Sequence, residues 1–68
     1  MSAYKVIQVV GTSSKSWEDA TQAAVSAAAK SLRDLRIARV TEMDVTVDKK
    51  GKVTQYRCKV DLSFKYEI

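Results

Sequence analysis

Residues 52–66, KVTQYRCKVDLSFKY, decide the fold because their side chains alternate between apolar and polar types with a period of two. Successive side chains of a β-strand face opposite sides of a sheet, so this pattern predicts a half-buried strand. At about 3.3 Å per residue, this segment spans roughly 50 Å when extended. That is nearly twice the ~26 Å implied by the radius of gyration of a 100-residue domain. The strand must therefore bend around another element, extend beyond its own subunit, or both. The expected apolar face carries Tyr56, Cys58, Val60, Leu62, Phe64 and Tyr66.

The chain is too short to form a large core. Its 68 residues are expected to make one domain, residues 1–68, and a domain of this size buries only about 60% of its unfolded surface. With one cysteine and no histidine, neither an intrachain disulfide nor a structural zinc site is expected. Self-association is the remaining common way to stabilise so small a fold.

The sequence favours a cytoplasmic protein. Met1 leads directly into the first predicted strand without a basic segment or cleavage site. No stretch approaches the ~20 apolar residues of a membrane span, so we expect no membrane partner. Cys58, a free thiol predicted to lie in the core, fits a reducing compartment.

The order of the other elements predicts an α+β fold of the type β-α-β-β. Residues 4–10 are rich in β-branched residues and carry apolar side chains on both faces, which hints at a second covering surface from another subunit. Residues 11–16 form a predicted loop, and residues 17 to 33 or 34 a predicted helix capped by Ser16. Residues 36–48 form a strand that a tight turn at 48–51 joins to the last strand. We expect a three-stranded antiparallel sheet that partly wraps one helix.

The face of the predicted helix that packs on the sheet consists almost entirely of small residues. Its residues follow the i, i+3, i+4 spacing of a buried helical stripe. Such a stripe requires the helix backbone to approach the sheet closely, with bulk supplied by the strands. The stripe consists of Ala20, Ala23, Ala24, Ala27, Ala28, Ser31, Leu32 and Leu35.

Catalysis has little support, and we expect no enzyme activity. Cys58 lies on the apolar face of a strand with no base beside it, which is typical of an inert buried thiol. Glu42 and Asp44 are two residues apart on a strand and share a face, where oxygen ligands suit calcium or magnesium. A symmetric assembly would repeat these carboxylates around an axis. The alternative is that they form surface ion pairs with Arg36, Arg39, Arg57 or Lys59.

Nucleic acid is an unlikely partner. Sheets that read single strands stack bases on aromatic side chains, and the polar face of the last strand has none. Its basic residues are interrupted by Asp61, and the lysines at positions 49, 50 and 52 are typical of a solvated turn.

The chain resembles the dodecins, small flavin-binding proteins that assemble as hollow homo-dodecamers. The resemblance covers nearly the whole chain. It rests on residues 4–6, the turn Gly11-Thr12-Ser13, the alanine-rich helix, Arg39-Val40-Thr41-Glu42 and the closing Val60-Asp61-Leu62-Ser63-Phe64. It implies the β-α-β-β unit described above and a dodecamer that accounts for the excess length of strand.

The resemblance also implies a set of flavin positions. Ile37 occupies the position of the aromatic residue that stacks on the flavin ring in this family. Arg57 occupies the position of the glutamine that binds the ring edge, and Gln55 lies two residues earlier. These replacements resemble the calcium dodecin branch, as do Ser16-Trp17-Glu18 and residues 37–40 followed by Glu42. Glu42 corresponds to an acidic position near a bound magnesium in the flavin branch.

We therefore expect a dodecameric protein that stores, buffers or sequesters a small ligand. A divalent cation, calcium or magnesium, at Glu42 and Asp44 is the preferred ligand. The alternative is a flavin held in an apolar slot of Ile37 and Met43, with Arg57 contacting the ring or phosphate. A purely structural or nucleic-acid-associated assembly is a third possibility.

Overall fold

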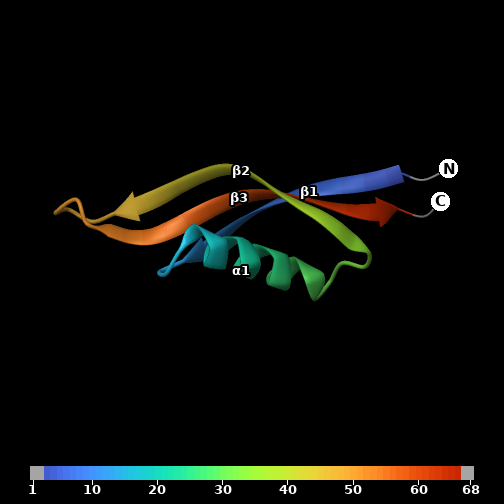
Figure 1. The fold of residues 1–68 in the computed structure, drawn as a ribbon, viewed down its shortest axis with the longest axis horizontal. Helices are drawn as coiled ribbons and strands as arrows, with labels where there is room; N and C mark the ends of the chain where they lie inside the picture. Colours follow the sequence, from blue (N-terminus) through green and yellow to red (C-terminus); the bar gives the residue numbers. More distant parts are fainter. Residues whose placement is uncertain (1–2, 67–68) are drawn as a thin grey trace.

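The last strand of the chain, β3 (Val53–Tyr66), lies at the centre of a three-stranded antiparallel sheet of order β1-β3-β2. The computed structural model describes residues 3–66. The flanking strands are β1 (Ala3–Ser13) and β2 (Leu35–Val47), and the helix α1 (Trp17–Ala29) lies against one face of the sheet (Figure 1). This confirms the expected α+β fold with a β-α-β-β order.

The core lies between β3 and α1. Cys58, Val60 and Leu62 are fully buried, as the alternation of the sequence predicts. They pack against three buried alanines of the helix, Ala20, Ala24 and Ala28. The Cys58 thiol donates a hydrogen bond to the Trp17 carbonyl at 3.3 Å. We call the side of the sheet that faces α1 the helix face, and the opposite side the outer face.

The helix begins where the sequence predicts but ends earlier. The Ser16 hydroxyl accepts a hydrogen bond from the Asp19 backbone N–H at 3.0 Å, which caps the first turn. The last helical residue is Ala29, so the expected end at residue 33 or 34 is wrong. The backbone N–H groups of Ser31 and Leu32 both bond the Ala28 carbonyl, which closes the helix in a tight turn. This turn lets Leu32 pack on the core before the chain enters β2.

The buried stripe of α1 is narrower than expected. Ala23 and Ala27 are exposed, so the fully buried residues of the helix are only those spaced by four, and Val25 packs beside them partly buried. The expected loop at residues 11–16 is also corrected, because β1 continues to Ser13. Gly11 is buried at this point, and a Cβ atom placed on it would collide with the Ala20 carbonyl oxygen and lie 2.9 Å from the Ala24 Cβ. The helix backbone therefore sits directly on β1 where both partners are small.

The alternation of side chains between the two faces of β2 is interrupted at Thr41. Val40 is opposite Val60 and Glu42 is opposite Lys59, so Thr41 is an extra residue in a β-bulge. Strict alternation would place Glu42 on the same face as Val40. This expectation is wrong, because the bulge moves Glu42 to the opposite face. Glu42 shares the outer face with Lys59, whereas Val40 lies on the helix face with Val60.

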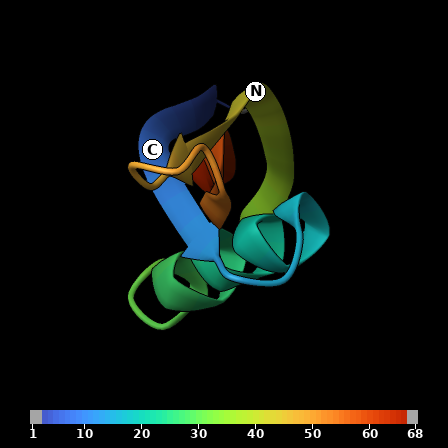
Figure 2. The same ribbon diagram turned by 90° about the vertical axis from the view of Figure 1, so that its left-hand side faces the viewer.

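The subunit is long and leaves much apolar surface open. Its extents are 53 × 19 × 14 Å, in line with the roughly 50 Å predicted for the last strand. The radius of gyration is 14.0 Å, compared with about 11 Å for a compact domain of this length. In Figure 2 the sheet curls over the helix, and both of its faces remain partly uncovered. Exposed apolar side chains occur on all three strands, among them Tyr4, Val6, Val10, Ile37, Val40, Met43 and Tyr66.

Because α1 lies so close to β1, we expect a side chain at Gly11 to destabilise the fold. Alanine is intrinsically better than glycine in a strand, but here its methyl group would overpack the core. We expect Gly11→Ala to lower the free energy of unfolding by about 1–3 kcal/mol, measured by urea denaturation at one protein concentration. Thr12→Ala, at the exposed neighbouring position, is the control and should change stability less. Equal or greater stability of Gly11→Ala would show that the helix does not rest on this strand.

Candidate functional site

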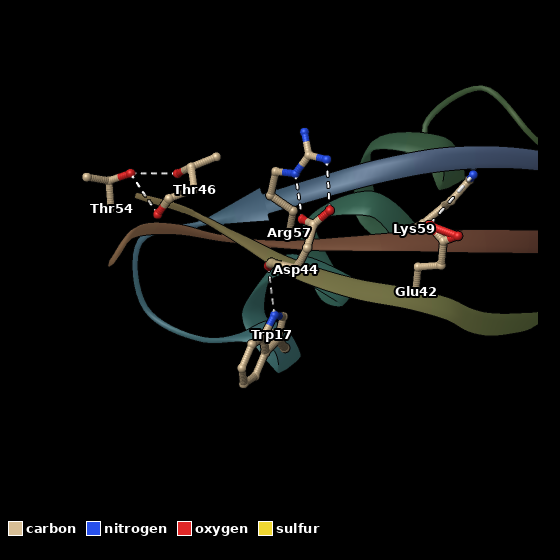
Figure 3. A network of polar contacts seen from close by, with 7 residues as sticks. All are labelled: Trp17, Glu42, Asp44, Thr46, Thr54, Arg57 and Lys59. Atoms are coloured by element: carbon tan, nitrogen blue, oxygen red, sulfur yellow. Dashed lines mark hydrogen bonds and ion pairs between the residues drawn. The ribbon is translucent and has the colours of Figure 1, made fainter. Parts of the chain in front are cut away.

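Two acid–base pairs cross from β2 to β3 on the outer face (Figure 3). Asp44 accepts two hydrogen bonds from Arg57, at 2.7 Å from Nε and 3.0 Å from Nη2. This is the bidentate geometry in which guanidinium and carboxylate groups match best. Glu42 and Lys59 form a looser pair, with 4.0 Å between Oε1 and Nζ.

The strand register brings these four side chains together. Asp44 is opposite Arg57 and Glu42 is opposite Lys59 in the antiparallel pairing. Opposite charges at facing positions stabilise such a pair of strands. The bulge at Thr41 is essential to the arrangement because it moves Glu42 onto the face that Lys59 occupies.

The four charged residues and Val10 line a shallow pocket of about 140 Å³. Val10 enters from β1, where it is opposite Lys59. Its contribution could not be predicted from the sequence, because the order of the strands was not known. The pocket has two carboxylates and two cations, so its formal charge is zero. All four charged side chains remain partly open to solvent.

The Asp44–Arg57 pair also affects protonation. The hydrogen bonds from Arg57 lower the pKa of the Asp44 carboxyl group below its usual value, and the same bonds raise the pKa of Arg57. Both groups are therefore charged near neutral pH, and the Asp44 carboxylate can act as an oxygen ligand there.

Trp17 links the start of α1 to β2 at Asp44. Its indole Nε1 donates a hydrogen bond to the Asp44 backbone carbonyl at 3.1 Å. Its ring meets Tyr56 edge-on, with 5.1 Å between centroids and 77° between planes. Figure 3 shows Trp17 on one side of the sheet and the two ion pairs on the other. Trp17 is thus a packing residue that fixes the backbone of Asp44.

The structure places Glu42 and Asp44 on one face, as the sequence predicts. Their ion pairs with Lys59 and Arg57 match the alternative considered from the sequence. Within residues 3–66, no three acidic, histidine or cysteine side chains gather around one point. Carboxylate oxygens are the right donors for calcium, but it takes six to eight oxygens. One chain thus offers part of a coordination sphere, and water or neighbouring subunits would have to supply the rest.

The predicted flavin positions do not converge within one chain. Ile37 is opposite Ser63 on the outer face, whereas Met43 is opposite Cys58 on the helix face. These two residues therefore form no common slot in the subunit. Gln55 is opposite Thr46, and the Arg57 guanidinium is already held by Asp44. The residues present do not fit a stacked flavin ring in the single subunit.

The part of the chain that the structure describes contains no helix long and apolar enough to cross a membrane.

Comparison with known proteins agrees with this fold. The sequence model of the dodecin family matches residues 3–67. The chain is 54% identical over 65 residues to the calcium dodecin of Mycobacterium tuberculosis, which covers 96% of this chain and 90% of that protein. It is 38% identical over 64 residues to the dodecin of Thermus thermophilus, covering 94% and 91% of the two chains.

Solved structures give the same result. A crystal structure of a T. thermophilus dodecin variant superposes with a TM-score of 0.91 at 35% identity and covers 100% of both chains. The crystal structure of the M. tuberculosis calcium dodecin, described as calcium-chelating with a novel calcium-binding site, superposes with a TM-score of 0.83 at 49% identity. It covers 96% of this chain and 91% of that one. Sequence and fold together place this chain in the dodecin family.

Proposed function

We propose that this protein is a cytoplasmic homo-dodecamer that stores, buffers or sequesters a divalent cation, with calcium as the preferred ion. The observation that carries the proposal is the placement of Glu42 and Asp44 on one face, where both carboxylates line the same pocket. Oxygen donors of this kind suit a hard cation. The similarity to a calcium dodecin supports calcium as the ion.

Assembly would complete what one chain lacks. The subunit exposes about 5264 Å², compared with about 4,300 Å² for a compact monomer of the same mass. Its exposed apolar side chains lie on both faces of the sheet, so neighbouring copies could cover both. Closed symmetry repeats each carboxylate around its axes, and donors from several subunits could then surround one ion.

Flavin is the rival ligand, and the outer face argues against it. Ile37 stands where the family resemblance expects a stacking aromatic ring, and its side chain is more than half exposed. Stacking of a nucleobase on an aromatic side chain contributes about 1–3 kcal/mol, so a similar contribution would be missing here.

Native mass spectrometry of the purified protein tests the assembly. We expect a species with the mass of twelve chains, and additional mass that corresponds to bound calcium. A monomer or dimer as the main species at micromolar concentration would contradict the dodecamer. Additional mass equal to a flavin would favour the rival ligand.

Calorimetric titration tests the cation site. We expect calcium to bind the wild type, and Glu42→Gln and Asp44→Asn each to weaken binding at least tenfold, because each variant loses a charged oxygen ligand. Asp34→Asn is the matched control, since it removes one negative charge in the α1–β2 connection and asparagine tolerates the positive φ found there. Identical curves for the wild type and both pocket variants would exclude these carboxylates as ligands. Magnesium is titrated in parallel to compare the two ions.

Fluorescence quenching tests the rival. Riboflavin emission should remain unchanged on addition of this protein at up to high micromolar concentration. Strong, saturable quenching would show that a flavin binds without the aromatic side chain at position 37.

A further inference from the structure

The pocket on the outer face already has balanced charge, and this determines what it can bind. Each carboxylate of β2 is matched by a cation of β3, Asp44 by Arg57 and Glu42 by Lys59. A divalent cation that binds both carboxylates exchanges with Arg57 and Lys59 for these oxygens, to which Arg57 is hydrogen-bonded and from which Lys59 lies 4.0 Å away. Arg57 loses two short hydrogen bonds in this exchange, so the two basic side chains compete with the ion for its ligands.

The exchange also leaves positive charge without a partner. Two carboxylates, one divalent cation and two basic side chains sum to a net charge of +2 within one small pocket. Like charges a few ångströms apart repel strongly even in a partly solvated site. A divalent cation is therefore better matched to this pocket when an anion with a charge near −2 restores the balance.

A phosphomonoester has the chemistry to supply that charge. Its charge is about −1.5 to −2 at pH 7, and its oxygens accept the paired N–H groups of a guanidinium in a planar, bidentate arrangement. Lys59 adds a point charge beside it. The volume of about 140 Å³ is several times the ~30 Å³ share of one water molecule, so the pocket has room for more than one small group.

We propose that the pocket of Val10, Glu42, Asp44, Arg57 and Lys59 binds a divalent cation and a phosphate-bearing anion together. Glu42 and Asp44 hold the cation, while Arg57 and Lys59 turn from the carboxylates to the phosphate. This inference rests on the proposed cation site. It adds that Arg57 competes with the cation when no anion is present and supports its binding when an anion is present.

Calorimetric titration of calcium, with and without glycerol 3-phosphate, tests the coupling on the intact protein. We expect the ester to tighten calcium binding by about tenfold, within the usual range for coupled sites. Thermodynamic reciprocity requires calcium to tighten binding of the ester by the same factor. Glycerol, which lacks the phosphate, should have no effect.

Replacing the Arg57 side chain, which competes with calcium for the carboxylates, should separate the two roles of this residue. Arg57→Gln is expected to bind calcium more tightly than the wild type when the ester is absent, and to lose the enhancement when it is present. Lys50→Gln, which removes one positive charge at the hairpin turn outside the pocket, is the matched control and should behave like the wild type. Arg57→Lys retains the positive charge, and circular dichroism verifies that each variant is folded. If Arg57→Gln does not fold, Lys59→Gln is used in its place.

The outcomes distinguish this inference from the proposed function. Calcium binding to the wild type that is unaffected by the ester would overturn the coupling and leave the cation site intact. No calcium binding with or without the ester would overturn both. Calcium binding that is detected only when the ester is present would support both the cation site and the coupling.

Discussion

The contact between α1 and the sheet is the interaction on which the rest of the structure depends. A buried stripe of alanines lies directly on β1 and β3, and Gly11 permits this because it has no side chain between the two backbones. The large side chains of the core all come from the strands, with Cys58, Val60 and Leu62 fully buried. This close packing lets a helix of 13 residues shield the middle of the sheet in a subunit whose longest extent is 53 Å.

The same packing explains why the subunit leaves so much apolar surface exposed. The helix covers the middle of β1 and β3 and contacts β2 only slightly, so β2 keeps apolar side chains such as Val40 and Met43 in solvent. On the outer face, Val6 and Val10 are also exposed. Exposed apolar surface on both sides of a thin sheet is typical of an interaction site, and one short helix does not reach it.

The sequence predicted those features that depend on local periodicity and capping. The alternation of residues 52–66 identified the central strand and its buried face, and Ser16 marked the start of the helix. The errors occurred where long-range packing overrides local pattern. The helix ends at Ala29 because the chain must return to the sheet, and β1 continues through Gly11 because this residue pairs with Cys58 of β3. The bulge at Thr41 has no clear local signal, so the face shared by Glu42 and Lys59 could not be derived before the register was known. Asp44 and Arg57 were recognised as possible partners from their charges alone, whereas the contribution of Val10 depended on the strand order.

The hydrogen bond from Trp17 to the Asp44 carbonyl has a spectroscopic consequence. The indole is the only one in the chain, and it is fixed to the backbone of a residue whose side chain lines the pocket on the opposite face. A change in the β2 backbone at Asp44 therefore alters the hydrogen bond of the indole and its edge-on contact with Tyr56. The protein thus contains an intrinsic fluorophore whose emission reports on the state of the sheet at Asp44, without any attached label.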